Sequence, residues 1–218
     1  MKGDPMKAKV LAARVISNVS SQLARRLNLK EGQRSIALLT SDCDDVTYTA
    51  LDEATKKAAV EVVYARSFYA GAANASTKLA GEVIGILAAP NPEEARSGLE
   101  AAVYAIENTA YFVSANEDDS IVYYAHCVSR TGAYLSEAAG VPKGEALAYL
   151  IAPPLEAVYG IDEALKASDV DLCVLYEPPS ETNFGGALLT GTQSACTAAC
   201  EAFASAVEAV AQRPLESQ

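Results

Sequence analysis

A segment of thirteen residues occurs twice in this chain, and the two copies lie about half a chain apart. Residues 51–63 read LDEATKKAAVEVV, and residues 161–173 read IDEALKASDVDLC. Asp, Glu, Ala, Lys and Val are identical at matching positions, and the Leu/Ile, Glu/Asp and Val/Leu exchanges are like for like. Repeats with a period of about 20 to 50 residues indicate a solenoid. A copy at this much larger distance instead predicts two folded units of one kind.

The similarity extends on both sides of this core. The segments that begin at Ser17 and Ser129 run parallel, as do residues 36–39 and 147–150 and the regions around Gly81 and Gly185. The first copy has a longer connection, residues 67–80. A chain of 218 residues has room for two domains of roughly a hundred residues each. We therefore expect a first domain at 1–108 and a second at 109–218.

Composition excludes several classes of protein. Half of the residues are hydrophobic, which is enough for a packed core. The net charge of −11 argues against nucleic acid as a partner and favours cationic small molecules. No apolar run approaches the length of a membrane span, and no signal-peptide core is present. The chain has five cysteines, and an odd number predicts reduced thiols. Together with the missing membrane span and signal peptide, this count predicts a cytoplasmic protein without membrane association.

Short strands and helices alternate in each half, which predicts an α/β fold class. Each half is expected to form an α+β sandwich, with a small sheet flanked by helices. Ser20 and Asn91 have the side chains of helix caps, and Pro92 suits a first helical position. In the second half we expect, among other elements, a strand at 170–176 and a helix at 193–212.

The inventory of catalytic side chains is small. The only histidine, His126, neighbours Cys127 in an expected strand, where adjacent side chains point to opposite faces. Cys196 and Cys200 share a helix face, but no further metal ligands stand nearby in the sequence. No phosphate-binding loop, nucleophile elbow or zinc-binding helix motif occurs. We therefore expect no catalytic residues, no metal site and no enzyme activity.

Acidic residues gather in two places. Residues 41–47 read SDCDDVT and place three carboxylates around one strand-to-helix turn, and residues 177–183 add two more in a Pro-rich loop. Acidic residues are common at helix starts and in exposed loops, because the helix dipole and the solvent stabilise their carboxylates. They also suit a small acidic pocket that binds an ammonium ion. Both interpretations stay open at this level.

Several motifs together resemble a known family. The pattern DEATK at 52–56, followed by a Val-rich strand and later an Ala-rich helix, resembles the bacterial microcompartment shell domain. The full set covers nearly the whole chain outside residues 1–6 and the tail after 212. It is similar to the tandem-domain shell proteins of ethanolamine utilisation, in which two domains are circularly permuted. The motifs are DDVTY at 44–48, VVYARSFYAGA at 62–72, SRTG at 129–132, APPLEA at 152–157 and ETN at 181–183.

This resemblance implies structural work. Its members form trimers that mimic a hexamer and tile with other shell proteins into a flat hexagonal sheet around enzymes. The lysine that lies four residues before a strand valine is at the tile edge in that family, and Lys56 and Lys166 match it. A central pore opens and closes by loop movement. Phe68, Tyr69 and Gly71 in the long first-half loop are the candidate gate, and residues 111–116 are a second candidate.

The resemblance also implies a small acidic pore in each subunit that binds ethanolamine. The residues that match it are Asp44, Asp45, Glu82, Phe112, Glu156 and Thr182. No cofactor is required, although the family has been associated with cobalamin. An alternative reading is a soluble regulatory protein that binds small molecules through an acidic amine site, without lattice assembly. The alternative predicts amine binding by trimers that stay discrete at all concentrations.

Overall fold

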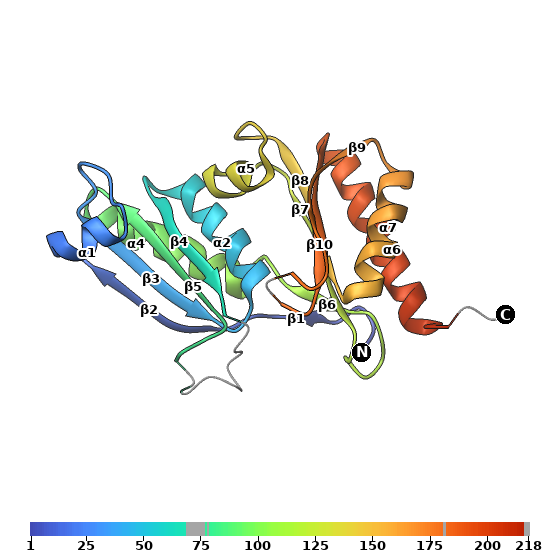
Figure 1. Ribbon diagram of the computed structural model, residues 1–218. Helices are drawn as coiled ribbons and strands as arrows, with labels where there is room; N and C mark the ends of the chain where they lie inside the picture. Colours follow the sequence, from blue (N-terminus) through green and yellow to red (C-terminus); the bar gives the residue numbers. More distant parts are fainter. Residues whose placement is uncertain (69–76, 78, 181, 216–218) are drawn as a thin grey trace. The chain divides into compact units, whose positions relative to one another are not determined.

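The computed structural model describes residues 1–68, 77, 79–180 and 182–215, and it divides into two compact units. The N-terminal unit comprises residues 7–110 with 132–135, and the C-terminal unit comprises residues 1–6, 111–131 and 136 onward. Figure 1 labels the helices and strands of both. Among the described residues, no helix combines the length and hydropathy needed to cross a membrane.

The N-terminal unit is a four-stranded antiparallel sheet with helices on both faces. Its strand order is β2-β3-β5-β4, and its two long helices pack together on one face (Figure 1). Val19, Leu27 and Leu29, which flank the short helix α1, pack against the cluster of Ile36, Ile86 and Ala88. The elements are β2 (Val10–Ile16), α1 (Ser21–Arg26), β3 (Ser35–Ser41), α2 (Asp44–Lys57), β4 (Glu61–Ser67), β5 (Val83–Ala89) and α4 (Pro92–Asn108).

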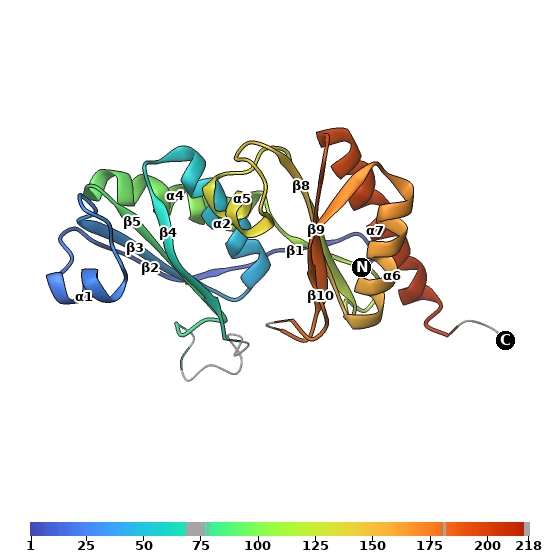
Figure 2. The same ribbon diagram turned by 45° about the horizontal axis from the view of Figure 1, so that its top comes forward.

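The C-terminal unit repeats this arrangement and extends it. Its sheet has the order β1-β6-β7-β8-β10-β9, and α6 and α7 lie together on one face (Figure 2). A core cluster that includes Leu150, Leu189, Phe203 and Val207 lies between the helices and the sheet. The elements are β1 (Pro5–Met6), β6 (Phe112–Ser114), β7 (Val122–Val128), α5 (Ala133–Ala139), β8 (Ala146–Ala152), α6 (Pro154–Ala167), β9 (Val170–Tyr176), β10 (Gly185–Gly191) and α7 (Gln193–Gln212).

The duplication expected from the sequence is confirmed by topology. The order β2-β3-β5-β4 in one unit corresponds strand for strand to β7-β8-β10-β9 in the other. Helix starts follow the sequence signals as well. The Asn91 side chain accepts the Glu94 backbone N–H at 2.8 Å, and Thr192 accepts that of Ala195 at 3.2 Å.

The compact units differ from the division at residue 108 in three places, the smallest being that the N-terminal unit extends to Ala110. Residues 1–6 belong to the C-terminal unit because β1 pairs with β6, with Pro5 opposite Val113. Residues 132–135 belong to the N-terminal unit because their backbone is hydrogen-bonded to α2. The β1–β6 pairing and the bonds to α2 join segments that lie far apart in the chain, and local sequence patterns do not predict such contacts.

Candidate functional site

Three of the expected amine-binding residues lie together in the N-terminal unit. Asp44 and Asp45 form the first turn of α2 and are both buried, and Glu82 directly precedes β5. The Glu82 backbone N–H donates to the Ser41 carbonyl at 2.7 Å, which holds the end of β3 beside the start of β5. Gly81 makes this approach possible because its φ is +74° and a Cβ there would lie 2.9 Å from the Ser41 oxygen.

Asp42 completes this group, which we call the acidic turn: Asp42, Asp44, Asp45 and Glu82. It was not among the expected site residues, although it belongs to the same SDCDD run. Its carboxylate accepts the Lys9 backbone N–H at 2.7 Å, and Asp44 accepts the Asp45 backbone N–H at 2.9 Å. Only the fold brings Glu82 to this run, because the two are separated in the chain by all of α2 and β4.

Electrostatics mark the acidic turn as an unusual place for negative charge. Burial, reinforced by the charges of Asp44 and Asp42, raises the pKa of Glu82 to about 7. Burial also raises the pKa of the Cys43 thiol, with Asp45 and Asp44 adding to the effect. Crowded carboxylates repel one another, so a bound cation would relieve that repulsion. A small ammonium ion has the charge and the donors that such a site needs.

The other three expected residues lie in the C-terminal unit. Phe112 is buried, and its ring packs against Tyr124 and Phe184 at centroid distances of 5.2 and 6.2 Å. Thr182 joins this group because its hydroxyl accepts the Phe184 backbone N–H at 3.2 Å. Glu156 lies half-buried in the first turn of α6 and does not share these contacts. Phe112 and Thr182 thus share Phe184 as a neighbour, whereas Glu156 lies on a different element.

The candidate gate is described only at its beginning. Phe68 directly follows β4 with an exposed side chain, and its backbone N–H donates to the Glu82 carbonyl at 2.8 Å. Tyr69 and Gly71 lie outside the described residues. Half of the second candidate, residues 111–116, lies in a sheet, since β6 (Phe112–Ser114) pairs with β1 on one side and β7 on the other.

The two lysines expected at a tile edge have different environments. Lys56 is 19% exposed and pairs with Asp52, at 3.5 Å, and with Glu53. Lys166 is 63% exposed and pairs with Asp162 and, at 3.2 Å, with Glu163. The spacing of the two ion pairs is therefore identical in both copies, while only Lys166 is well exposed.

The histidine and cysteines that were considered for catalysis make packing contacts in the structure. His126 stacks on Tyr124 at 5.4 Å, whereas the Cys127 sulfur lies 3.5 Å from the Thr197 hydroxyl of α7. Burial raises the pKa of Cys196 to about 11, so its thiol is unreactive near neutral pH. Within the described part of the chain, no group of three or more His, Cys, Asp or Glu side chains could hold a metal ion.

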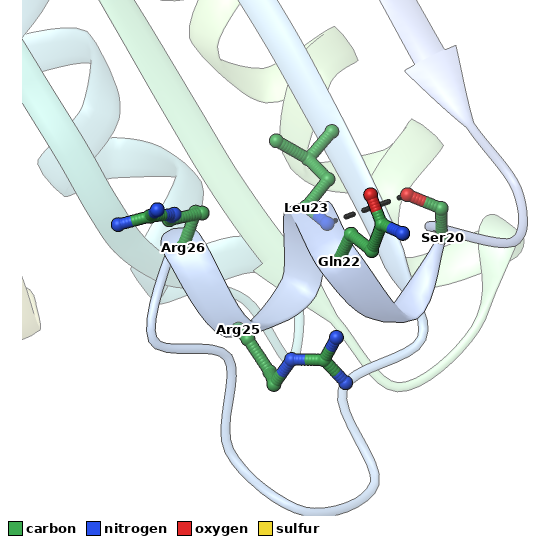
Figure 3. Close-up of a pocket in the computed structure, with 5 residues that line it drawn as sticks. All are labelled: Ser20, Gln22, Leu23, Arg25 and Arg26. Carbon is green, nitrogen blue, oxygen red and sulfur yellow. Dashed lines mark hydrogen bonds between the residues drawn. The ribbon is translucent and has the colours of Figure 1, made fainter.

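A surface hollow of about 760 Å³ lies beside α1 (Figure 3). It is lined by Ser20, Gln22, Leu23, Arg25 and Arg26. Figure 3 shows Arg25 and Arg26 pointing to different sides of the helix, and neither faces a carboxylate in this group. With two cationic side chains, this hollow is unsuited to an amine and is separate from the acidic turn.

Known proteins resemble this chain over its whole length, although no protein-family model matches it. The bacterial microcompartment shell protein EutL of Clostridium perfringens is 66% identical over 215 residues, which are 99% of each chain. EutL of Escherichia coli is 53% identical over 98% of this chain and 97% of its own. The crystal structure of the ethanolamine utilization protein EutL from Leptotrichia buccalis superposes with a TM-score of 0.97. It is 68% identical, and the match covers 100% of both chains.

More distant structures share the fold alone. The trimeric shell protein PduB superposes with a TM-score of 0.77 at 19% identity, over 94% of this chain and 89% of its own. The much higher identity to the EutL proteins, across essentially complete chains, is far beyond what a shared fold requires. The chain therefore belongs to the EutL family of bacterial microcompartment shell proteins.

Proposed function

We propose that this protein is a structural tile of the shell of an ethanolamine-utilisation microcompartment. The observation that carries the proposal is 66–68% identity to EutL proteins over 99–100% of the chain. The duplicated antiparallel sheets, with two long helices on one face of each, support it. In this proposal the protein works by assembly and not by catalysis, and its place in the cell is the microcompartment shell.

The tile is a homotrimer in which six similar units mimic a hexamer. Two units of one topology per chain support this, because three chains then supply six equivalent positions. Trimers pack with other shell proteins into a hexagonal sheet, with Lys166 at the edge. A central pore, gated by the loop that begins at Phe68, passes metabolites or cofactors. The association with cobalamin stays a prediction, and we assign no residue to it.

The acidic turn is the proposed amine site. Ethanolamine carries an ammonium group at neutral pH, and this group pairs with the carboxylates of Asp44, Asp45 and Glu82. The crowding of those carboxylates with Asp42, and the raised pKa of Glu82, support a site that gains from a bound cation. Phe112, Glu156 and Thr182 remain predicted contacts.

Electron microscopy of the concentrated protein tests the shell role. We expect flat, hexagonally packed sheets of trimers at low and moderate salt. Discrete trimers at every concentration would contradict tiling and favour the alternative, a soluble regulatory protein that binds amines. Calorimetric titration with ethanolamine, with ethylene glycol as the uncharged control, tests the amine site independently of assembly.

A further inference from the structure

The hydroxyl of Ser67, the last residue of β4, is buried without a hydrogen-bond partner among the described residues. The residue as a whole is only 9% exposed. A buried hydroxyl in this state is unfavourable, because it has lost its hydrogen bonds to water and gained none in the protein. Folded proteins keep few such groups, so the position of this hydroxyl bears on function.

The Ser67 side chain lies on the face of the sheet that α2 covers. Ser67 in β4 and Ser41 in β3 are both register partners of Val83 in β5, so the three side chains point to the same face. On this face the Ser41 and Thr47 hydroxyls are hydrogen-bonded to each other at 2.6 Å, and Thr47 belongs to α2. The Ser67 hydroxyl therefore points toward the same helix.

The part of α2 that faces Ser67 is its first turn. Helix α2 packs on β4 and β5, and a Cβ at Gly85 would lie 2.8 Å from the Leu51 side chain of the helix. Ser67 pairs nearer to the beginning of β5 than Gly85 does, beside the turn of α2 that precedes Leu51. Figure 1 shows the end of β4 and the start of α2 at the same end of the sheet. This first turn carries Asp44 and Asp45 of the acidic turn.

The backbone beside Ser67 is joined to the acidic turn as well. The Phe68 N–H donates to the Glu82 carbonyl at 2.8 Å, and the Glu82 N–H donates to the Ser41 carbonyl at 2.7 Å. These two bonds continue the pairing of β4 with β5 and of β5 with β3 beyond the strand ends. Ser67 and Glu82 are thus held on adjacent chain segments at one end of the sheet.

The Ser67 hydroxyl has the chemistry that the carboxylates of the acidic turn lack. A hydroxyl both donates and accepts, so it can pair with a neutral hydroxyl, whereas carboxylates only accept and pair best with an ammonium group. Since no hydrogen bond within the described part of the chain holds Ser67 in its present rotamer, rotation about χ1 can turn the oxygen toward a ligand without breaking one. Together the two kinds of group match the two ends of an amino alcohol.

We propose that the Ser67 hydroxyl hydrogen-bonds the hydroxyl group of an amino alcohol whose ammonium group is held by the carboxylates of the acidic turn. Ser67 then makes the site selective for amino alcohols over alkylamines of the same size. A site that offers a buried polar group to a ligand hydroxyl binds the analogue without that hydroxyl more weakly, because its own group stays unpaired. This inference rests on the proposed amine site and adds the residue that contacts the second functional group of the ligand.

Titration calorimetry with two ligands of similar size tests the assignment. Ethanolamine and n-propylamine both carry an ammonium group at pH 8, and they differ by a hydroxyl in place of a methyl group. Glu82 is largely ionised at this pH, because its pKa is about 7. We expect the unsubstituted protein to bind ethanolamine at least about tenfold more tightly than propylamine. In Ser67→Ala this ratio should fall below about threefold through loss of ethanolamine affinity, with the affinity for propylamine kept.

Stability without ligand gives a second measurement. Because Ser67→Ala removes a hydroxyl that has no partner, the urea midpoint of unfolding should stay equal or rise. Ser97→Ala, at an exposed position of α4, is the matched control and should change neither the affinity ratio nor the midpoint. A lower midpoint in Ser67→Ala would show that the hydroxyl pairs within the protein, and this result would overturn the proposal.

The outcomes separate this proposal from the proposed amine site. If Ser67→Ala keeps the full preference for ethanolamine, or if the unsubstituted protein binds both amines equally, the role of Ser67 is overturned and the amine site stands. If the unsubstituted protein binds neither amine, the amine site and this inference both fail. The shell role is independent of these results, because electron microscopy tests it separately.

Discussion

The Asp52 carboxylate accepts the backbone N–H of Leu135 at 2.9 Å, across 83 residues of sequence. The same carboxylate accepts the Gly132 N–H and lies 3.5 Å from the Lys56 ammonium. Asp52 is completely buried, so these partners are what makes its burial favourable. The Leu135 and Gly132 bonds fasten residues 132–135 to α2, and they explain why this segment belongs to the N-terminal unit.

Replacing Asp52 by Ala should destabilise the protein strongly. Two buried backbone donors would lose their acceptor and Lys56 would lose a partner, so we expect the free energy of unfolding to fall by about 2–4 kcal/mol. Urea denaturation monitored by circular dichroism measures the change. Asp171→Ala, at an exposed strand position, is the matched control and should change stability by less than about 0.5 kcal/mol. Equal stability of the two variants would show that the Asp52 contacts contribute nothing.

Glu82 should make stability fall with rising pH. Its pKa is about 7 in the folded protein against an ordinary value of 4.5, so between these values the folded state binds more protons than the unfolded state. The contribution of Glu82 to the free energy of unfolding is therefore fully present below pH 4.5 and is lost as pH rises through 7.

The variant Glu82→Gln isolates this effect because it cannot ionise. Since Glu82 is partly exposed, solvent screening limits the gain over the unsubstituted protein at pH 8 to on the order of 1 kcal/mol, with little difference at pH 5. Unfolding by urea at four pH values gives the profile. Glu100→Gln, at an exposed position of α4, should leave the profile unchanged. A Glu82→Gln profile parallel to the original would rule out titration of Glu82 in this range.

Replacing Asp45 by Asn should weaken amine binding by at least tenfold, because a charge-assisted contact to the ammonium group is lost while the side-chain shape is kept. The mass of the assembly should stay that of a trimer. Isothermal titration with ethanolamine measures the affinity. Asp169→Asn removes one negative charge from an exposed position and controls for the general field of the protein. Unchanged affinity in the Asp45 variant would remove this residue from the site.

Replacing Lys166 by Asp should stop tiling and leave trimers intact. Its ammonium group is exposed and pairs only with carboxylates of its own helix, within the described residues. Surface ion pairs contribute little to stability, so folding should be preserved. Electron microscopy of the concentrated variant gives the result. Lys57→Asp reverses the charge of an exposed lysine at the end of the equivalent helix α2, and it should still form sheets. Sheets in the Lys166 variant would refute the edge role.

The boundaries of helices and strands with strong local sequence signals were predicted correctly. The strand Val170–Tyr176 and the helix Gln193–Gln212 have the expected limits, since β-branched residues and a Thr cap specify them locally. The two-residue strand β1 and the three-residue β6 were not predicted as strands. They are too short to have a period of their own, and each is defined by pairing with a distant partner.

The acidic turn was predicted only in part, because some of its residues have local sequence signals and others depend on distant contacts. The sequence by itself placed Asp44 and Asp45 at a helix start, because acidic side chains favour the first turn. Glu82 was matched to these residues by family resemblance, and its approach to them depends on pairing of β3 with β5. Asp42 was already part of the acidic run in the sequence, and the structure adds that its charge helps to raise the pKa of Glu82.

The sequence by itself determined the duplication, the order of the longer strands and helices and the family, because these depend on residue patterns within each copy. Only the tertiary structure decided that two equivalent faces have different surroundings. Asp52 is buried under residues 132–135, while Asp162, in the same pattern, is exposed. Burial and hydrogen bonding depend on which distant segment lies against a residue. The repeated sequence pattern is the same in both copies, so it does not show which copy has such a segment against it.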